Sequence, residues 1–269
     1  MMGETGMDPV FEFTAGRAAV LLSIPHDGRL IPPEIAARMT GRALRIPDTD
    51  WHLGRLYDFA NALGASVLAA RYSRYVVDLN RDPAGEALYP GADNTEIVPS
   101  TTFEREPIYH ARSEPDAAEI VRRIERYWRP YHDRLAAAIA EIRARFGHVV
   151  VFDAHSIRSV VPRFFDGVLP DFNFGTASGA SAGAGIAARA FAVLDRADGF
   201  TAADNGRFTG GYITRHYGDP AGGVHTIQLE LSQRTYMSET DPFDYRPERA
   251  GLVQPVLREM LAAMLDWAK

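Results

Sequence analysis

Consecutive apolar positions along the chain predict several buried strands. Residues 18–24 and 149–152 are apolar at nearly every position, which is typical of strands covered on both faces. Shorter runs rich in β-branched and aromatic residues predict further strands at residues 66–70, 75–79, 212–214 and 226–231. Polar residues that could carry chemistry follow or interrupt these runs. This arrangement is typical of an α/β enzyme whose site lies where strands end.

Apolar residues at helical spacing predict helices between the strands. Residues 49–63 have this spacing, and Gly64 is expected to end the helix. A longer helix is predicted at residues 113–146, with a kink near Pro130. Other predicted segments are a helix that ends at Leu194, a C-terminal helix at residues 247–268 and a long irregular excursion at residues 82–113.

The composition predicts one domain, argues against nucleic acid as a partner and excludes cysteine chemistry. With 269 residues, 46% of them apolar, the chain can bury a sizeable core, and we expect a single domain over residues 1–269. The net charge of −6 argues against nucleic acid, because that binding needs clustered positive charge. The absence of cysteine excludes disulfides and thiolate nucleophiles. Neither a signal peptide nor a membrane-spanning run is recognised, so we expect a cytoplasmic protein.

Two histidines follow predicted buried strands and are candidate metal ligands. His26 comes just after residues 18–24, and His155 comes just after residues 149–152. Neutral imidazole is a common ligand of catalytic zinc, which takes three protein ligands and leaves one position for water. A single histidine at a strand end is more often structural. The joint pattern is what favours a metal site.

A carboxylate is expected as the third ligand, because two neutral imidazoles compensate a divalent cation poorly. Asp50 is our choice, at the start of a predicted helix, and Asp48 has nearly the same claim. Asp27 is a weaker candidate. Asp153 lies two residues before His155 and is either a ligand or a partner that orients an imidazole.

Further polar residues could supply acid–base chemistry and carboxylate recognition. Glu230 lies in an apolar run, where a carboxylate is costly unless it is paired or catalytic. It is either a general acid/base or a structural partner for Arg234. Asn80 and Arg81, with Arg74 upstream, offer amide and guanidinium donors that suit a carboxylate. The set is typical of a metal-dependent hydrolase whose substrate carries a carboxylate.

Six polar segments are spread over the chain between about residues 20 and 240. They read SIPHDG at 23–28, DTDWH at 48–52, SRYVVDLNR at 73–81, DAHS at 153–156, GRFTGGYITRHYG at 206–218 and GVHTIQLELSQR at 223–234. In combination these segments are far more specific than any one of them. Through them the chain resembles the N-formylglutamate amidohydrolase (N-formylglutamate deformylase) family.

The resemblance implies an α/β fold with a three-layer mixed sheet flanked by helices, related to the zinc carboxypeptidases and aspartoacylases (a phosphorylase/hydrolase-like fold). It also implies one zinc ion (Zn²⁺) per chain. The carboxypeptidase pattern places a glutamate ligand three residues after the first histidine, whereas this chain has Arg29 there, so the carboxylate ligand must come from elsewhere. The roles implied are metal binding by His26 and His155, catalysis by Glu230 and Arg74, and substrate binding by Asn80 and Arg81. To these we add, from the residues alone, Asp50 as the carboxylate ligand and Arg215 as the candidate for binding the side-chain carboxylate of the substrate.

The activity implied by the resemblance is hydrolysis of N-formyl-L-glutamate to formate and L-glutamate, a step of histidine degradation. Two alternatives remain, a related metal-dependent deacylase of another N-acyl amino acid and a non-catalytic carboxylate-binding protein. A serine hydrolase is a third, because residues 179–183 read GASAG and match the pattern G-x-S-x-G. That pattern needs a buried strand before it, and residues 171–178 are polar and glycine-rich, which argues against it.

Overall fold

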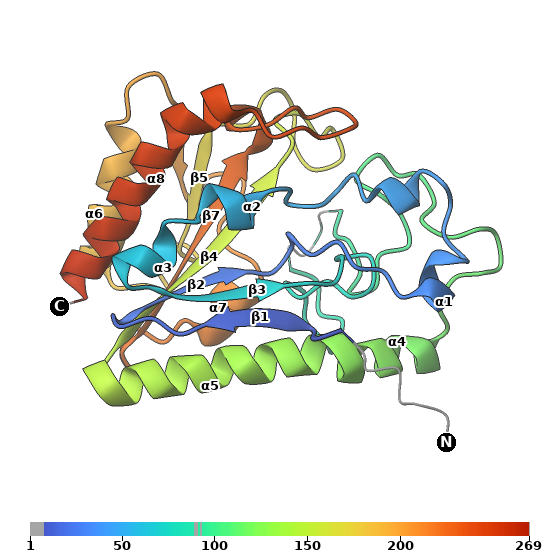
Figure 1. Cartoon of the computed structure of the whole chain (residues 1–269), viewed down its shortest axis with the longest axis horizontal. Coiled ribbons are helices and arrows are strands. Elements are labelled where there is room, and N and C mark those ends of the chain that lie inside the picture. The colour runs from blue at the N-terminus through green and yellow to red at the C-terminus, as the bar shows by residue number, and fades with distance from the viewer. Residues whose placement is uncertain (1–7, 89–90, 92, 269) are drawn as a thin grey trace.

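A mixed seven-stranded sheet forms the centre of the molecule (Figure 1). The computed structural model describes residues 8–88, 91 and 93–268. We expect no signal peptide at the N-terminus, but residues 1–7 of that segment lie outside the described part. In space the strands follow the order β1-β3-β2-β4-β7-β5-β6. Their bounds are β1 Phe11–Thr14, β2 Val20–Ile24, β3 Ser66–Ala70, β4 Val149–Ile157, β5 Phe172–Gly175, β6 Ala202–Asp204 and β7 Val224–Ser232.

Helices cover both faces of this sheet, which confirms the expected mixed α/β architecture. On one face α5 packs on β2, where the Tyr131 and Ser23 hydroxyls lie 3.0 Å apart. On the other face, beside α2, the rings of Tyr57 and Phe152 meet edge to face at 5.6 Å. Figure 1 shows α5 and α8 on opposite sides of the strands. The helices are α1 Pro33–Ala36, α2 Leu53–Leu56, α3 Ala60–Leu63, α4 Ala117–Arg123, α5 Arg129–Phe146, α6 Ala184–Asp195, α7 Tyr212–Tyr217 and α8 Pro247–Trp267.

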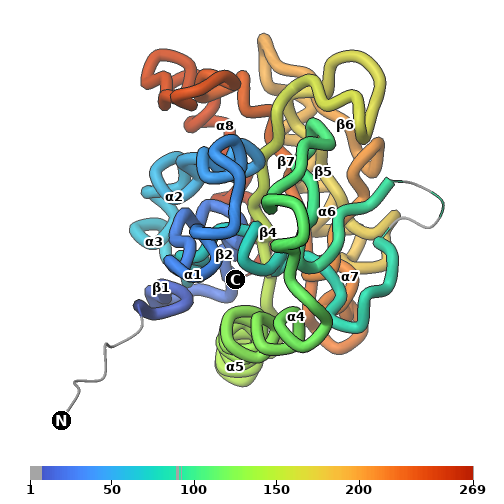
Figure 2. The backbone as a smooth tube through the Cα atoms, turned by 90° about the vertical axis from the view of Figure 1, so that its right-hand side faces the viewer, coloured from blue at the N-terminus to red at the C-terminus, as the bar shows by residue number. Residues whose placement is uncertain are grey.

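The strand order reverses between the neighbouring parallel strands β2 and β4. After β2 the chain continues to β3 on one side, and after β4 it continues to β5, β6 and β7 on the other. Figure 2 shows β1 and β6 toward opposite ends of the sheet. Connections that diverge in this way leave a crevice at the carboxyl ends of the two strands. His26 follows β2 and His155 lies near the end of β4, so both reach this crevice.

Most apolar side chains belong to one main core. Its buried members run from Val10 to Ala268, and they include every residue of β2 except Ser23. A smaller cluster, Phe103, Ile157, Val161 and Leu169, packs with three partly buried phenylalanines near the carboxyl end of β4. Within the described residues, no helix is long and apolar enough to cross a membrane.

Two of the six predicted strands are wrong. Residues 75–79 are buried but form turns, because the Ser73 side chain accepts a hydrogen bond from the Tyr75 amide at 3.2 Å and so offers the backbone an alternative to strand pairing. Residues 212–214 lie in α7, whose first amides are bound by side chains from elsewhere in the fold. The other four predicted strands are confirmed. The short strands β1, β5 and β6 were not predicted.

The predicted helix at residues 49–63 is divided into α2 and α3. His52 adopts a left-handed backbone conformation with φ 66°, and the Asp27 carboxylate accepts from the amides of His52 and Gly54 at 3.0 and 2.9 Å. This interaction satisfies amides at the start of α2. Asp50 therefore lies in the loop before the helix and not in its first turn.

The long helix predicted at residues 113–146 is present, with one irregular segment. A π-helix at Ile124–Trp128 separates α4 from α5, and Pro130 follows in the first turn of α5. Such segments frequently occur near functional sites. The irregularity thus precedes the proline at which a kink was expected.

Candidate metal centre and active site

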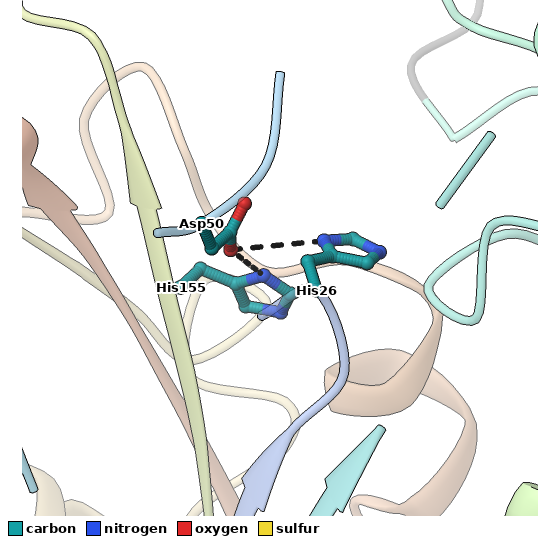
Figure 3. A group of neighbouring side chains, drawn as sticks. All are labelled: His26, Asp50 and His155. Carbon is teal, nitrogen blue, oxygen red and sulfur yellow. Dashed lines mark hydrogen bonds and ion pairs between the residues drawn. The ribbon is translucent and has the colours of Figure 1, made fainter. Parts of the chain in front are cut away.

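His26, Asp50 and His155 converge in the crevice after β2 and β4 (Figure 3). Their potential ligand atoms lie within 4.8 Å of one another. Asp50 Oδ2 is 3.0 Å from His155 Nδ1 and 3.7 Å from His26 Nδ1. All three side chains are buried. The structure therefore brings together the three residues that the sequence nominated as ligands.

The other ring nitrogen of each histidine is bound by a second carboxylate. His26 Nε2 lies 2.8 Å from Asp78 Oδ1, and His155 Nε2 lies 2.9 Å from Asp153 Oδ2. Each carboxylate accepts a hydrogen bond from Nε2, and Nδ1 of each ring faces Asp50; in the presence of a metal ion Nδ1 would supply a lone pair to the metal. Metal-binding histidines are usually oriented by such a carboxylate partner. Asp153 thus occupies the orienting position that the sequence left open.

These donors fit a divalent metal ion. His26 Nδ1 is buried and has no hydrogen-bond partner among the described residues, whereas buried polar atoms normally have one. Burial would raise the pKa of Asp50, but its hydrogen bond with His155 and the nearby His26 ring lower it overall. Burial opposes the charged form of His155, yet Asp153 and Asp50 raise its pKa well above the usual value. Buried carboxylates around two imidazoles create a negative potential that suits a cation.

Asp48 and Asp27 do not belong to this group. Asp48 Oδ2 accepts from the Tyr75 hydroxyl at 2.5 Å and from the Phe103 amide at 2.8 Å. Burial raises the pKa of Asp48. Asp27 binds the amides at the start of α2. Both carboxylates therefore hold loops in place, and Asp50 is the one that faces both histidines.

A cavity of about 600 Å³, measured with its open mouth, adjoins the histidines. Parallel register places Glu230 on β7 opposite His155 on β4, and Gln228 opposite Asp153. Because side chains alternate along strands, these four residues share one face of the sheet. The polar members of the cavity wall outside the three converging residues include Arg74, Asn80, Arg81, Arg207, Gln228 and Glu230.

Glu230 is a buried carboxylate without a structural partner. Its carboxyl group makes no hydrogen bond or ion pair with the described residues, and burial raises its pKa to about 8. Arg234, the structural partner considered from the sequence, instead donates to Asp171 at 3.0 Å. That alternative is wrong. A pKa in this range suits a group that must both accept and return a proton near neutral pH.

Arg74 is buried beside the histidines. Its Nη2 donates to Asp78 Oδ2 at 2.6 Å, and its Nη1 lies 3.7 Å from Asp50 Oδ1. Burial lowers the pKa of a guanidinium, but Asp78 and Asp50 raise that of Arg74. Asp78 therefore connects Arg74 to His26, a role that sequence reasoning missed. The sequence hints at this role of Asp78 only by placing an acidic residue directly after the apolar residues Val76 and Val77.

Asn80 lies between the histidine site and α7. Its Oδ1 accepts from the Ile213 amide at 2.8 Å, and its Nδ2 lies 2.9 Å from His155 Nε2. A Cβ atom at Gly211 would come within 2.3 Å of Asn80 Nδ2, so only glycine allows this approach. Gln228 Oε1 accepts from the Gly211 amide at 2.7 Å. Two side chains of the cavity wall thus fix the start of α7.

Arg81 also faces the cavity, and Arg215 does not. Arg81 donates to Thr95 O at 3.0 Å, Thr95 Oγ1 at 2.8 Å and its neighbour's carbonyl, Asn80 O, at 2.9 Å. Arg215 is exposed and donates to Gly210 O and Thr209 Oγ1 in a separate hollow. The structure therefore does not bring Arg215 to the cavity beside the histidines. Arg207 is there instead, and the same sequence segment at 206–218 contains both.

The serine of the G-x-S-x-G match is structural. A buried strand, β5, does precede it, contrary to the sequence reading, but the Ser181 hydroxyl is buried and donates to Thr226 O at 2.7 Å. Among the described residues no histidine is hydrogen-bonded to it. The arrangement lacks the base that a serine nucleophile needs.

Comparison with known proteins shows the relatives of this chain. Residues 18–237 match the sequence profile of the N-formylglutamate amidohydrolase family. A protein of Pseudomonas aeruginosa named N-formylglutamate deformylase is 49% identical over 263 residues, which cover 98% of each chain. One of Pseudomonas putida with the same name is 48% identical over 261 residues, covering 97% of each chain.

Solved structures agree with the sequence relatives. A crystal structure of N-formylglutamate amidohydrolase from Ralstonia eutropha JMP134 has a TM-score of 0.79 at 26% identity and covers 96% of this chain and 97% of that one. A structure from Agrobacterium tumefaciens has a TM-score of 0.72 at 19% identity, covers 97% and 96%, and supports the fold alone. The profile match and the near-half identity along almost the whole length show that this chain belongs to the N-formylglutamate amidohydrolase family.

Proposed function

We propose that this chain is a metal-dependent amidohydrolase that converts N-formyl-L-glutamate and water to formate and L-glutamate, within histidine degradation. The relatives named N-formylglutamate deformylase support the substrate. The observation that carries the proposal is the convergence of His26, Asp50 and His155 beside the buried carboxyl of Glu230. In this proposal the three residues hold one zinc ion, an assignment that rests on their two nitrogen donors and one oxygen donor.

Each residue near the metal site has a defined task in the proposed reaction. A bound zinc ion supplies Lewis-acid polarisation of a carbonyl and lowers the pKa of water. Asp78 and Asp153 hold the imidazoles with Nδ1 toward the site. Glu230 accepts a proton from the attacking water and returns it to the leaving nitrogen of glutamate, so that the C–N bond breaks to an amine and formate. Arg74, held by Asp78, provides positive charge for the developing oxyanion.

Substrate positioning falls to the other side of the cavity. The Ile213 amide occupies the Asn80 oxygen, and the Asn80 nitrogen lies 2.9 Å from His155 Nε2. The second N–H of this side-chain amide is the donor that we assign to a carboxylate. Arg81 adds a fixed positive charge, because Thr95 and the Asn80 carbonyl immobilise its guanidinium. We assign the α-carboxylate of the substrate to this pair. Holding that carboxylate places the neighbouring N-formyl group toward the histidines.

The test is formate release from N-formyl-L-glutamate by protein stripped with a chelator and then reloaded with zinc. Activity that is lost on stripping and restored by zinc is the expected result. N-acetyl-L-glutamate and N-formyl-L-aspartate are assayed in parallel, and a preference for either would favour the related deacylase. Tight binding of N-formylglutamate by the zinc-loaded protein without turnover would instead favour a carboxylate-binding protein.

A further inference from the structure

The proposed substrate carries two carboxylates, whereas only one has an assigned partner. The inference below therefore rests on the proposed function and concerns the side-chain carboxylate. Among the described residues, three arginines line the cavity, namely Arg74, Arg81 and Arg207. Arg74 is bound to Asp78 and lies close to Asp50. It therefore lies where we expect the N-formyl group of the substrate to react. Arg81 adjoins Asn80 at the expected α-carboxylate position.

Arg207 is held by contacts that orient its guanidinium. It lies in the segment between β6 and α7, where its Nε donates to the Phe164 carbonyl at 2.5 Å. Its guanidinium carbon lies 5.2 Å from the centroid of the Phe208 ring. The hydrogen bond to Phe164 and the contact with the Phe208 ring both restrict the plane of the group. The Nη1–Nη2 edge, opposite the bond to Phe164, has the shape that binds a carboxylate through two parallel hydrogen bonds.

The position of Arg207 is tied to the rest of the site through the backbone that follows it. Four residues later the Gly211 amide is bound by Gln228, and the Ile213 amide is bound by Asn80. Asn80 therefore contacts both the expected α-carboxylate site and the segment that contains Arg207. These hydrogen bonds thus connect the segment of Arg207 to Asn80, the neighbour of Arg81.

Apart from Arg74, Arg81 and Arg207, the described part of the cavity wall contains no lysine or arginine that could bind a second carboxylate. Phe103, Phe164 and Phe208 line the same cavity. Asp93 also lines it, but this carboxylate is bound by Arg163 and Arg105 at 2.9 and 2.8 Å. A guanidinium among aromatic rings lies in a setting of reduced dielectric constant, where a charge-assisted hydrogen bond is strong and a neutral group in its place is disfavoured.

We infer that Arg207 binds the side-chain carboxylate of the substrate and determines the preference for acidic N-acyl amino acids. In this inference Arg207 contacts the substrate far from the bond that breaks. Its loss should therefore change which substrates the enzyme prefers. A neutral isostere of the side chain loses this interaction, and a substrate without the α-carboxylate keeps it. The interaction assigned to Arg81 behaves in the opposite way: a substrate with a neutral side chain keeps it, and a substrate without the α-carboxylate loses it.

Three substrates separate these contributions in the zinc-loaded enzyme. They are N-formyl-L-glutamate, N-formyl-L-glutamine, which has a neutral side chain, and N-formyl-4-aminobutyrate, which lacks the α-carboxylate. Arg207→Ala should lower kcat/KM for N-formylglutamate by about 10- to 100-fold, mainly through KM, and should change it little for N-formylglutamine. Arg81→Ala should affect both of these substrates and spare N-formyl-4-aminobutyrate. Arg207→Lys should restore only part of the preference.

Two further arginine variants complete the design. Arg196→Ala, which removes an exposed arginine paired with Glu259, is the control and should match the wild type. Arg215→Ala tests the rival assignment, and a selective loss with N-formylglutamate in that variant would overturn the inference. Equal losses of Arg207→Ala with the glutamate and glutamine substrates would also overturn it, because they would indicate a merely structural role.

Failure of the proposed function gives a different pattern. In that case the zinc-loaded wild type hydrolyses none of the three substrates, whatever Arg207 does. Calorimetric titration with N-formylglutamate and N-formylglutamine then tests the inference directly. A preference for the acidic ligand that disappears in Arg207→Ala supports it, and a preference that survives contradicts it.

Discussion

Glu230→Gln should lower activity and at the same time stabilise the metal-free protein at alkaline pH. The buried carboxyl has a pKa raised from its usual 4.5 to about 8. Its folded form therefore keeps a proton that the unfolded form loses above pH 4.5. Stability is full below that pH and is lost as the pH rises through 8, because the unfolded state binds fewer protons. Glutamine cannot ionise, so the variant escapes this loss.

The size of the effect follows from the same pKa. Each unit between the two pKa values is worth about 1.4 kcal/mol, so the total approaches roughly 5 kcal/mol. Between pH 5 and pH 8 the advantage of Glu230→Gln should grow by roughly 3–4 kcal/mol. Urea denaturation of chelator-treated protein at several pH values measures it. Glu114→Gln, which changes an exposed glutamate, is the matched control and should show no such trend.

Reloading the same variant with zinc tests the catalytic part. Without a group that accepts the proton of water, kcat should fall by roughly 10²–10⁴, with little change in substrate affinity. Two results would refute the reasoning. One is a stability difference that is the same at pH 5 and pH 8, which would mean that the carboxyl is not desolvated. The other is a kcat near the wild-type value, which would exclude Glu230 as the acid/base group.

Three other predictions concern the metal, the serine and a buried histidine. His26→Ala and Asp50→Ala should lose bound zinc, whereas Asp48→Ala should keep it and unfold more easily; metal analysis and melting curves that show the reverse would reassign the carboxylate ligand. Ser181→Ala should retain formate release, and its inactivation would revive the serine mechanism. Burial lowers the pKa of His132 to about 3, so the unfolded form binds a proton first as the pH falls below about 6.5. His132→Phe should therefore be less stable at pH 7 by about 1–3 kcal/mol, because its partner Leu79 O loses a donor. Urea denaturation should show this deficit shrinking by pH 5, and a deficit independent of pH would contradict it.

Much of the site could be predicted because it follows local patterns. His26 and His155 come after apolar runs that could only be buried strands, and the carboxyl ends of neighbouring parallel strands meet at one edge. Glu230 is a carboxylate within such a run, where its burial is evident from the sequence. Strand periodicity also places Asp153 and His155 on one face. These inferences need only residue type and spacing.

Other features depended on hydrogen bonds that particular side chains make to the backbone. Residues 75–79 and 212–214 have strand-like composition, yet the Ser73 hydroxyl turns the first and the side chains of Asn80 and Gln228 bind the leading amides of the second. Local propensity does not register such side-chain partners, least of all Asn80, which lies 133 residues from Ile213. The same limit applies to the helix at residues 49–63, which Asp27 divides.

The choice among similar residues was also decided by the tertiary structure. Asp48 and Asp50 are two positions apart, and only the packing of Tyr75 and Phe103 around Asp48 turns it away from the histidines. Arg207 and Arg215 share one sequence segment, but α7 begins between them and directs them into different hollows. Sequence spacing determines which residues can approach a strand end. Which of them faces the cavity depends on how long-range contacts satisfy the surrounding backbone groups.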